Sequence, residues 1–272
     1  NFSSLKITFF ILLNSKKKIK LKNLISNIDS NQTLNAKIKF IDHHMSHIAS
    51  STFFSNFKDC VKLSVDGFGD FSSCSWGLYE NNKIKLDKKI YFPHSLGIFY
   101  QSLTQFLGFK SYGDEYKLMG LSPYGKPIYK DKLFNLIHFT DNGFELNLDY
   151  FLHHKEKIFF VNDKGQFEYK NIYSNKIYNL LGDERKPNDP ITQKHKDLAK
   201  SIQSVYEDVF FHILNNLHSK YNSNNLSLSG GCAMNSVANG KITKKTKFKD
   251  VYISPNPGDA GGSVGSAAYF LQ

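Results

Sequence analysis

Hydrophobic and polar residues alternate along residues 61–65, where valine and leucine occupy every second position. A period of two is typical of a β-strand, so the pattern predicts a strand that ends at Asp66. Two further strands are predicted over residues 75–79 and 84–91, and the Asn81-Asn82 pair between them suits a tight turn. These three strands are expected to form an antiparallel meander.

Apolar residues spaced three and four apart replace this alternation further along the chain. They predict helices over residues 98–107 and 195–218. The closing part alternates between strands at 226–228 and 251–253 and helices at 235–242 and 263–270. Strands that run into glycine-rich turns and then helices are typical of an α/β fold, which collects its ligands at the carboxyl ends of the strands.

The opening residues carry weaker signals. A helix is predicted over residues 21–28, after the lysine-rich run 16–22, and a short strand is predicted from Ile38 to Ile41. The apolar run at 7–13 is far shorter than the roughly 20 residues that span a bilayer, so no membrane segment is expected.

Charge and cysteine content narrow the function classes. The chain has 35 Lys and Arg against 24 Asp and Glu. The resulting net charge of +11 suggests a nucleic acid as a binding partner. However, Arg185 is the only arginine, and surfaces that grip phosphates and bases favour the guanidinium group, so nucleic-acid binding is not expected. Cys60, Cys74 and Cys232 form no CxxC motif, which favours a reducing, cytoplasmic compartment.

The most specific local motif is the pair His43 and His47. A spacing of four places both imidazoles on one face of a helix, as a metal site requires, although two hydrogen-bonded histidines would give the same spacing. Asp66 and Asp259 lie where α/β folds collect ligands, and the four together would form a mixed nitrogen and oxygen site for Fe(II), Mn(II) or Zn(II). The alternative for Asp259 is a helix N-cap.

Two glycine-rich turns, residues 66–69 and 229–232, could offer backbone N–H groups to an anion, or could simply be tight turns. Residues 113–125 are bounded by glycines and carry both charges, which by itself indicates a solvated loop. Asp149, taken by itself, is likewise interpreted as part of a solvated loop. The chain contains no G-x-S-x-G motif for a serine nucleophile.

Taken in order, several segments closely resemble the amino-terminal, Kae1-like domain of the O-carbamoyltransferases, the family of nodulation-factor, tobramycin and cephamycin carbamoylating enzymes. The matching segments cover most of the chain from about residue 38 onward, and they are residues 43–50, 63–67, 95–100, 113–125, 199–203, 228–240 and 258–261.

The resemblance implies an actin-like, sugar-kinase-like ATPase fold built from two ribonuclease-H-like lobes. On this basis residues 1–58 are expected to be a remnant of the first lobe and residues 59–272 the second lobe with a closing helix. The resemblance also implies the roles of individual residues. The metal ligands would be His43, His47, Asp66 and Asp259, with iron as the metal; Gly67, Gly69, Gly230, Gly231 and Asn235 would border an adenylate; and Asp149 would meet the acceptor.

The chemistry implied by the resemblance is carbamoyl transfer. Carbamoyl phosphate and ATP would form carbamoyl adenylate in a separate YrdC-like domain, and this domain would move the carbamoyl group onto the hydroxyl of a small-molecule acceptor. The family's opening segment carries a histidine expected to act as the base, and residues 1–37 contain no histidine. The chain is therefore expected to be truncated at both ends. Two alternatives stay open: a relative of the tRNA threonylcarbamoyl transferases, and a non-catalytic fragment that binds metal and nucleotide.

Overall fold

The computed structural model describes residues 39–161 and 167–272. Asn1–Ile41 and Asp42–Gln272 are separate units, and every helix and strand described below belongs to the second unit. The apolar run, the lysine-rich run and the helix predicted before residue 38 lie outside the described residues. The short strand predicted from Ile38 is not found over residues 39–41, which are neither helix nor strand, because the chain there leads directly into the cap of a helix at Asp42.

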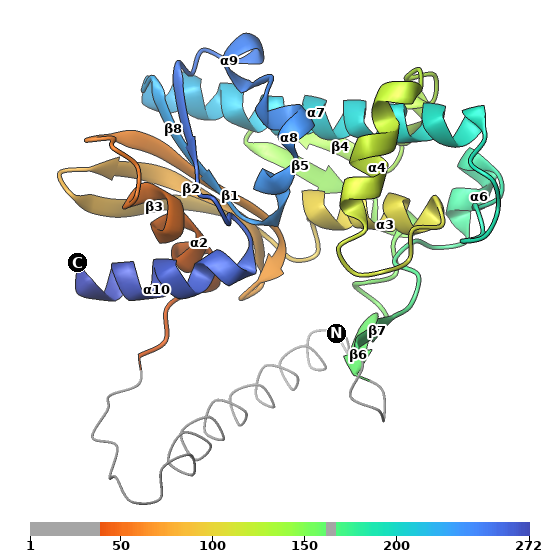
Figure 1. Cartoon of the computed structure of the whole chain (residues 1–272), viewed down its shortest axis with the longest axis horizontal. Helices are drawn as coiled ribbons and strands as arrows, with labels where there is room; N and C mark the ends of the chain where they lie inside the picture. Colours follow the sequence, from red (N-terminus) through yellow and green to blue (C-terminus); the bar gives the residue numbers. More distant parts are fainter. Residues whose placement is uncertain (1–38, 162–166) are drawn as a thin grey trace, which may run out of the picture. The chain divides into compact units, whose positions relative to one another are not determined.

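A five-stranded mixed sheet forms the centre of this unit (Figure 1). Strands β1 (Cys60–Gly69), β2 (Ser72–Glu80) and β3 (Lys83–Tyr91) are antiparallel, as the alternating pattern predicts. Strands β8 (Asn225–Ser229) and β9 (Asp250–Ile253) run parallel to β1 on its other side, so the order is β3-β2-β1-β8-β9. The carboxyl ends of β1, β8 and β9 therefore meet at one edge of the sheet.

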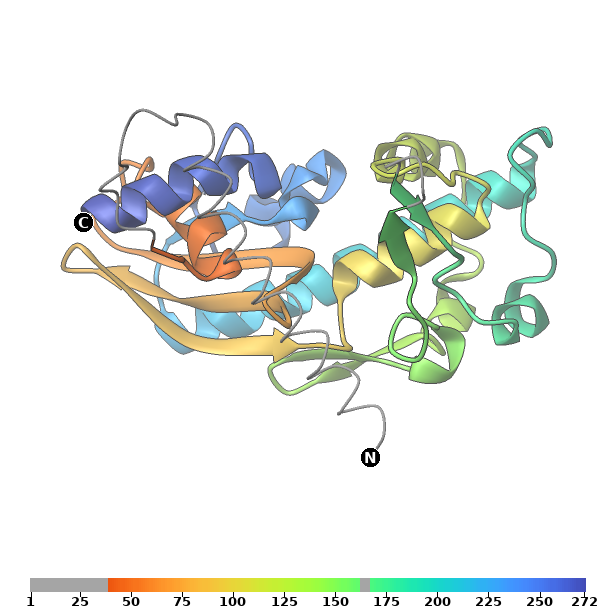
Figure 2. The same ribbon diagram turned by 90° about the horizontal axis from the view of Figure 1, so that it is seen from below.

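Helices cover both faces of the sheet. Helix α2 (His43–Thr52) packs on one face and α10 (Gly262–Leu271) packs against α2, whereas α3 (Leu96–Phe106) and α7 (Gln193–Tyr221) pack on the other face (Figures 1 and 2). The helices predicted over 98–107, 195–218 and 263–270 are confirmed. Helix α2 packs against the sheet within the unit Asp42–Gln272, and the domain boundary expected at residue 58 stays a prediction.

Short elements connect α3 to α7. They are α4 (Glu115–Leu121), the 3-10 turn η1 (Ser122–Tyr124), α5 (Lys130–Leu133), the hairpin β4 (Ile137–Thr140) and β5 (Gly143–Leu146), the 3-10 turn η2 (Leu148–Tyr150), the hairpin β6 (Phe159–Val161) and β7 (Phe167–Tyr169), and α6 (Lys176–Leu181). The interpretation of residues 113–125 as a loop was wrong, because α4 and η1 occupy most of them. Leu118 is fully buried in the core and anchors α4 there.

The helix predicted over residues 235–242 is also corrected. The chain instead forms a 3-10 turn η3 (Gly231–Met234), then α8 (Ser236–Asn239) and α9 (Ile242–Lys245). Asparagine and glycine are weak helix formers, and the Asn239-Gly240 pair ends α8 after one turn. The Asn235 side chain accepts a hydrogen bond from the backbone of Ala238 and thereby starts α8 at Ser236.

The main hydrophobic core lies on the side of the sheet that faces α3 and α7. Val61, Leu63 and Val65 of β1 are fully buried there with leucine, isoleucine and phenylalanine side chains of both helices. Within residues 39–161 and 167–272, no helix has the length and apolar character that crossing a bilayer demands.

Candidate metal centre

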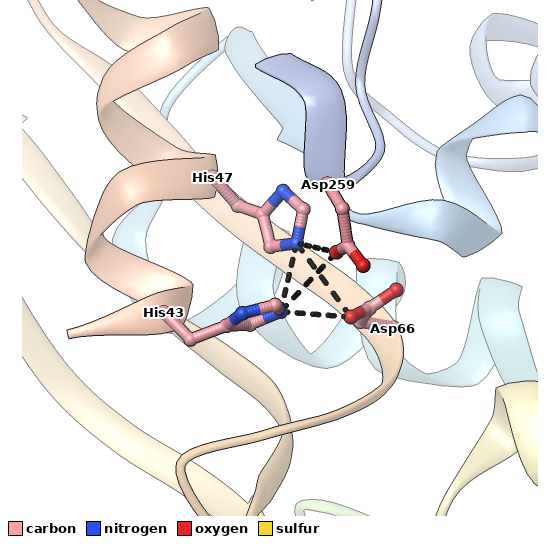
Figure 3. Close-up of side chains that lie close together, drawn as sticks. All are labelled: His43, His47, Asp66 and Asp259. Atoms are coloured by element: carbon pink, nitrogen blue, oxygen red, sulfur yellow. Dashed lines mark hydrogen bonds and ion pairs between the residues drawn. The ribbon is translucent and has the colours of Figure 1, made fainter. Parts of the chain in front are cut away.

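Four side chains from three parts of the chain converge at the carboxyl edge of the sheet (Figure 3). The Nε2 atom of His43 lies 2.9 Å from Asp66 Oδ2 and 3.0 Å from His47 Nε2. Asp259 Oδ1 lies 3.6 Å from His43 Nε2 and 3.4 Å from His47 Nε2. One donor atom from each residue lies within 4.8 Å of those of the others. The structure thus brings together the four residues that the sequence had selected.

Helix α2 places the two imidazoles on one face. Asp42 caps this helix, because its side chain accepts a hydrogen bond from the backbone N–H of Met45 at 3.0 Å. The backbone N–H of His43 donates to Asp70 Oδ2 at 3.0 Å, which ties the start of the helix to the turn after β1. The first ring therefore lies at the helix entrance, and His47 follows one turn later.

Asp66 lies in β1 directly after Val65, where the regular pairing with β2 is interrupted. Its Oδ1 atom accepts a hydrogen bond from the backbone N–H of Gly231 at 2.8 Å, while Oδ2 faces the two histidines. The carboxylate thus connects the histidine pair to the glycine turn after β8.

The N-cap alternative for Asp259 was wrong. Asp259 begins the 3-10 turn η4 (Asp259–Gly261), and neither η4 nor the following α10 has a side-chain cap. Its carboxylate points toward the histidines instead, and 68% of the side chain is exposed, so this residue forms the open side of the cluster (Figure 3).

The two carboxylates of the cluster favour a positive charge among the four side chains. Burial opposes a charge on His47, yet its hydrogen bonds with Asp259 and Asp66 outweigh burial and raise its pKa to about 9. Burial also opposes the charge on Asp66, but its hydrogen bonds with His43 and His47 hold its pKa well below the ordinary value. The hydrogen bond with His47 is the main cause of the lowered pKa of Asp259.

His44, on the same helix, has a different environment. Its Nδ1 lies 2.9 Å from Ser64 Oγ, and its Nε2 lies 2.9 Å from the carbonyl of Ser72. Burial lowers its pKa to about 4, so this histidine is neutral at physiological pH. It fastens α2 to the sheet and contributes no atom to the cluster.

The prediction that residues 66–69 form a turn was wrong, because β1 continues through them to Gly69. The two glycines of this segment have distinct surroundings. A Cβ atom at Gly69 would lie 2.0 Å from atoms of the His43 ring, so the absent side chain makes room for that imidazole. A Cβ atom at Gly67 would meet nothing within 4 Å. Gly67 thus borders open space, while the packing of His43 accounts for Gly69 without a nucleotide.

The backbone N–H groups of Gly230 and Gly231, in the second glycine-rich turn, already donate hydrogen bonds within the protein. The N–H of Gly230 donates to the carbonyl of Pro257 at 2.8 Å, and that of Gly231 donates to Asp66. Gly230 has a positive φ of 88°, and a Cβ there would lie 2.2 Å from the carbonyl oxygen of Val65. The tight-turn interpretation therefore describes this segment, and these two N–H groups are not free to bind an anion.

Asn235 belongs to a buried network that the sequence did not reveal. Its Oδ1 accepts from Gln203 Nε2 at 3.1 Å, and its Nδ2 donates to Gln203 Oε1 at 3.0 Å. The Tyr100 hydroxyl donates to the same Gln203 Oε1 at 2.7 Å. The only signal in the sequence was that each of these residues lies in a different segment of the family resemblance. Contact of Asn235 with an adenylate stays a prediction.

Asp149 lies on the turn η2, and its carboxylate pairs with Lys176 Nζ at 2.6 Å. It is not a member of the four-residue cluster. Its expected contact with an acceptor stays a prediction.

The four residues fit a divalent cation. Two imidazole nitrogens 3.0 Å apart and two carboxylate oxygens face one point, and this arrangement needs a positive charge among them. Two nitrogen and two oxygen donors suit a transition metal better than calcium or magnesium. The donor set lies beside the carboxyl ends of the parallel strands, where α/β sheets collect ligands, and defines a candidate metal centre.

The class of enzyme follows from comparison with known proteins. Residues 4–268 match the family model described as Carbamoyltransferase N-terminus. The chain therefore belongs to the carbamoyltransferase family.

Individual relatives agree with this family. The chain is 39% identical over 231 residues to the uncharacterized protein sll1178 of Synechocystis, covering 84% of this chain and 35% of the relative. It is 31% identical over 253 residues to the nodulation protein NolNO of Sinorhizobium fredii, covering 92% of this chain and 34% of that protein. The chain thus spans about a third of the length of these relatives.

Among solved structures, the crystal structure of HypF from T. kodakarensis is similar at 15% identity and a TM-score of 0.44, covering 92% of this chain and 38% of that chain. A likeness this distant does not define a shared fold.

Proposed function

We propose that this chain is the metal- and nucleotide-binding part of an O-carbamoyltransferase, which moves a carbamoyl group from carbamoyl adenylate to the hydroxyl of a small-molecule acceptor. The observation that carries the proposal is the cluster of His43, His47, Asp66 and Asp259 in a chain of the carbamoyltransferase family. We further propose Fe(II) as the resident metal, because the mixed donor set suits Fe(II), Mn(II) or Zn(II) and the resemblance to the O-carbamoyltransferases favours iron among them.

The residues of the cluster have complementary tasks in this proposal. His43 and His47 would offer Nε2 lone pairs from a rigid helix, and Asp66 and Asp259 would offer negative charge. A divalent cation at this point supplies Lewis acidity against the charge that builds on the carbonyl oxygen and the departing phosphate. The exposed side chain of Asp259 leaves this centre open on one side, where a ligand can approach.

The wider architecture of the enzyme is also proposed. The sheet order, with three antiparallel strands followed by two parallel strands, supports a ribonuclease-H-like lobe of an actin-like fold. A YrdC-like domain would supply carbamoyl adenylate from ATP and carbamoyl phosphate. Gly67 borders open space beside Asp66 near the end of β1, and an adenylate could approach there.

The test is a titration of the chain with carbamoyl adenylate by calorimetry, with Fe(II) under anaerobic conditions and with EDTA. We expect binding that requires the metal. Binding of Fe(II) without binding of carbamoyl adenylate would overturn the transferase proposal and leave a metal site of another function.

Two exposed aspartates provide the variant and its control. Asp259→Asn should weaken both Fe(II) and adenylate binding, because it removes one charge from the cluster. Asp149→Asn should leave both unchanged, because Asp149 is similarly exposed but contacts Lys176 instead. Equal behaviour of the two variants would contradict the assignment of Asp259.

A further inference from the structure

The strand pairing of β1 is irregular around Asp66. The pairing of β1 with β2 runs from Cys60 to Val65 and resumes only at Gly69. The pairing of β1 with β8 ends at Ser64. Residues 66–68 therefore have no paired residue in either register, and any buried carbonyl there needs a partner.

Ser95 provides that partner. Its hydroxyl lies 3.1 Å from the carbonyl oxygen of Asp66 and 2.7 Å from that of Gly67, and the residue is fully buried. The same Oγ atom accepts a hydrogen bond from the backbone N–H of Ile98 at 3.1 Å, which caps α3. One hydroxyl thus joins the start of α3 to the backbone of Asp66 and Gly67.

Gly97 allows the helix to come this close. A Cβ atom at Gly97 would lie 2.9 Å from the carbonyl oxygen of Asp66 and 2.9 Å from backbone atoms of Gly67. Any larger residue at this position would push the backbone of Asp66 and Gly67 away from α3.

We propose that Ser95 is a positioning residue that aims the Asp66 carboxylate at the cation. Gly231 holds Oδ1 of that carboxylate from one side, and Ser95 holds its backbone from the other, so Oδ2 stays directed at the histidines. Hydrogen bonds behind a metal ligand fix its orientation, and their loss typically weakens metal binding. This inference rests on the proposed metal centre.

The test measures Co(II) affinity by chelator competition, and the visible absorption of bound Co(II) reports the ligand geometry. Ser95→Gly removes the hydroxyl, yet glycine is tolerated at an N-cap at a cost of a few tenths of a kcal/mol, so the helix should persist. We expect an affinity loss of about 10- to 100-fold and an altered Co(II) spectrum.

Ser102→Ala is the matched control. Ser102 lies on the same helix and is equally buried, but its hydroxyl bonds only the carbonyl of Phe99 in its own helix. Its affinity and spectrum should equal those of the wild type. Gly97→Ala provides a second approach to the same segment, should Ser95→Gly fail to fold, and it should also weaken Co(II) binding.

The outcomes separate the two proposals. If the wild-type chain binds no Co(II), the metal centre itself is wrong. If the wild type and Ser102→Ala bind Co(II), and Ser95→Gly binds it with the same affinity and spectrum, the metal centre stands and the positioning role of Ser95 is overturned. Where Ser95→Gly does not fold, the same result with Gly97→Ala overturns that role.

Discussion

Successive residues of strand β1 alternate between two faces of the sheet. One of these faces is apolar and the other is polar. Val61, Leu63 and Val65 face α3 and α7 and are fully buried in the hydrophobic core. Lys62 and Ser64 lie between them on the other face and are equally inaccessible to solvent. On that second face, Ser64 bonds His44 of α2, and Asp66 continues the row into the cluster.

Within one strand, the apolar face thus serves the stability of the fold, and the polar face serves the candidate metal site. The apolar face gains free energy from burial, whereas the polar face holds α2 through side-chain hydrogen bonds such as that of Ser64 with His44. Those bonds are directional, so they fix where the helix lies as well as whether it binds. A metal-binding pair on α2 requires this fixed position.

The largest expected effect concerns the polar face. His47→Ala removes a donor that is 1% exposed and contacts His43, Asp66 and Asp259, so stoichiometric metal binding should be lost. Metal content after dialysis measures this loss. His138→Ala, an exposed histidine that pairs with Glu145, is the control and should retain the metal. Equal metal content in both variants would remove His47 from the site.

On the apolar face, Leu63→Ala should lower the free energy of unfolding by about 2–5 kcal/mol, because it leaves a cavity in the core. Chemical denaturation measures the loss. The folded variant should keep its metal affinity, since Leu63 points away from the cluster. A variant that loses metal binding while remaining folded would show that the two faces are not separable.

Two glycines at the end of β1 offer a smaller and sharper contrast. Gly69→Ala places a Cβ against the His43 ring, whereas Gly67→Ala places one in open space. We expect Gly69→Ala to weaken metal binding about 10- to 100-fold through displacement of a ligand, and Gly67→Ala to leave it unchanged. Chelator competition measures both, and equal affinities would show that the His43 position tolerates the added methyl group.

The smallest effect concerns Lys62, whose Nζ is buried without a hydrogen-bond partner among the described residues. Burial lowers its pKa from 10.5 to about 7. Lys62→Met should therefore stabilise the protein by about 1–2 kcal/mol at neutral pH, because it removes a poorly solvated amine.

The pH dependence of this gain has a defined sign. Between pH 7 and 10.5 the unfolded chain binds the Lys62 proton more tightly than the folded chain, so wild-type stability rises with pH there. The advantage of Lys62→Met should be largest at pH 7 and shrink as the pH approaches 10.5. Denaturation curves at several pH values measure it, and a constant difference would contradict the burial of a titrating amine.

Much of this arrangement could be predicted from sequence, because it follows from the period of the hydrophobic residues and from the spacing of the two histidines. The alternation at residues 61–65 predicts β1, and the interval between His43 and His47 predicts a shared helical face. The convergence of Asp66 and Asp259 followed from strand ends and from the family resemblance.

Other features depend on contacts between distant segments and leave no local pattern. The backbone N–H of Gly231 bonds Asp66, and Gln203 bonds Asn235, across 165 and 32 positions of sequence. Helix α4 was missed because its mixed charges resemble a loop, although Leu118 is buried in the core. The sequence therefore predicts the site's donors better than the supports that hold them.

The most direct test of the account is a crystal of the chain grown with Fe(II) under anaerobic conditions, with data collected at the iron absorption edge. We expect one anomalous peak within bonding distance of His43 Nε2, His47 Nε2, Asp66 Oδ2 and Asp259 Oδ1. An anomalous map with no peak among these four atoms, from crystals in which the wild-type side chains are ordered, would contradict it.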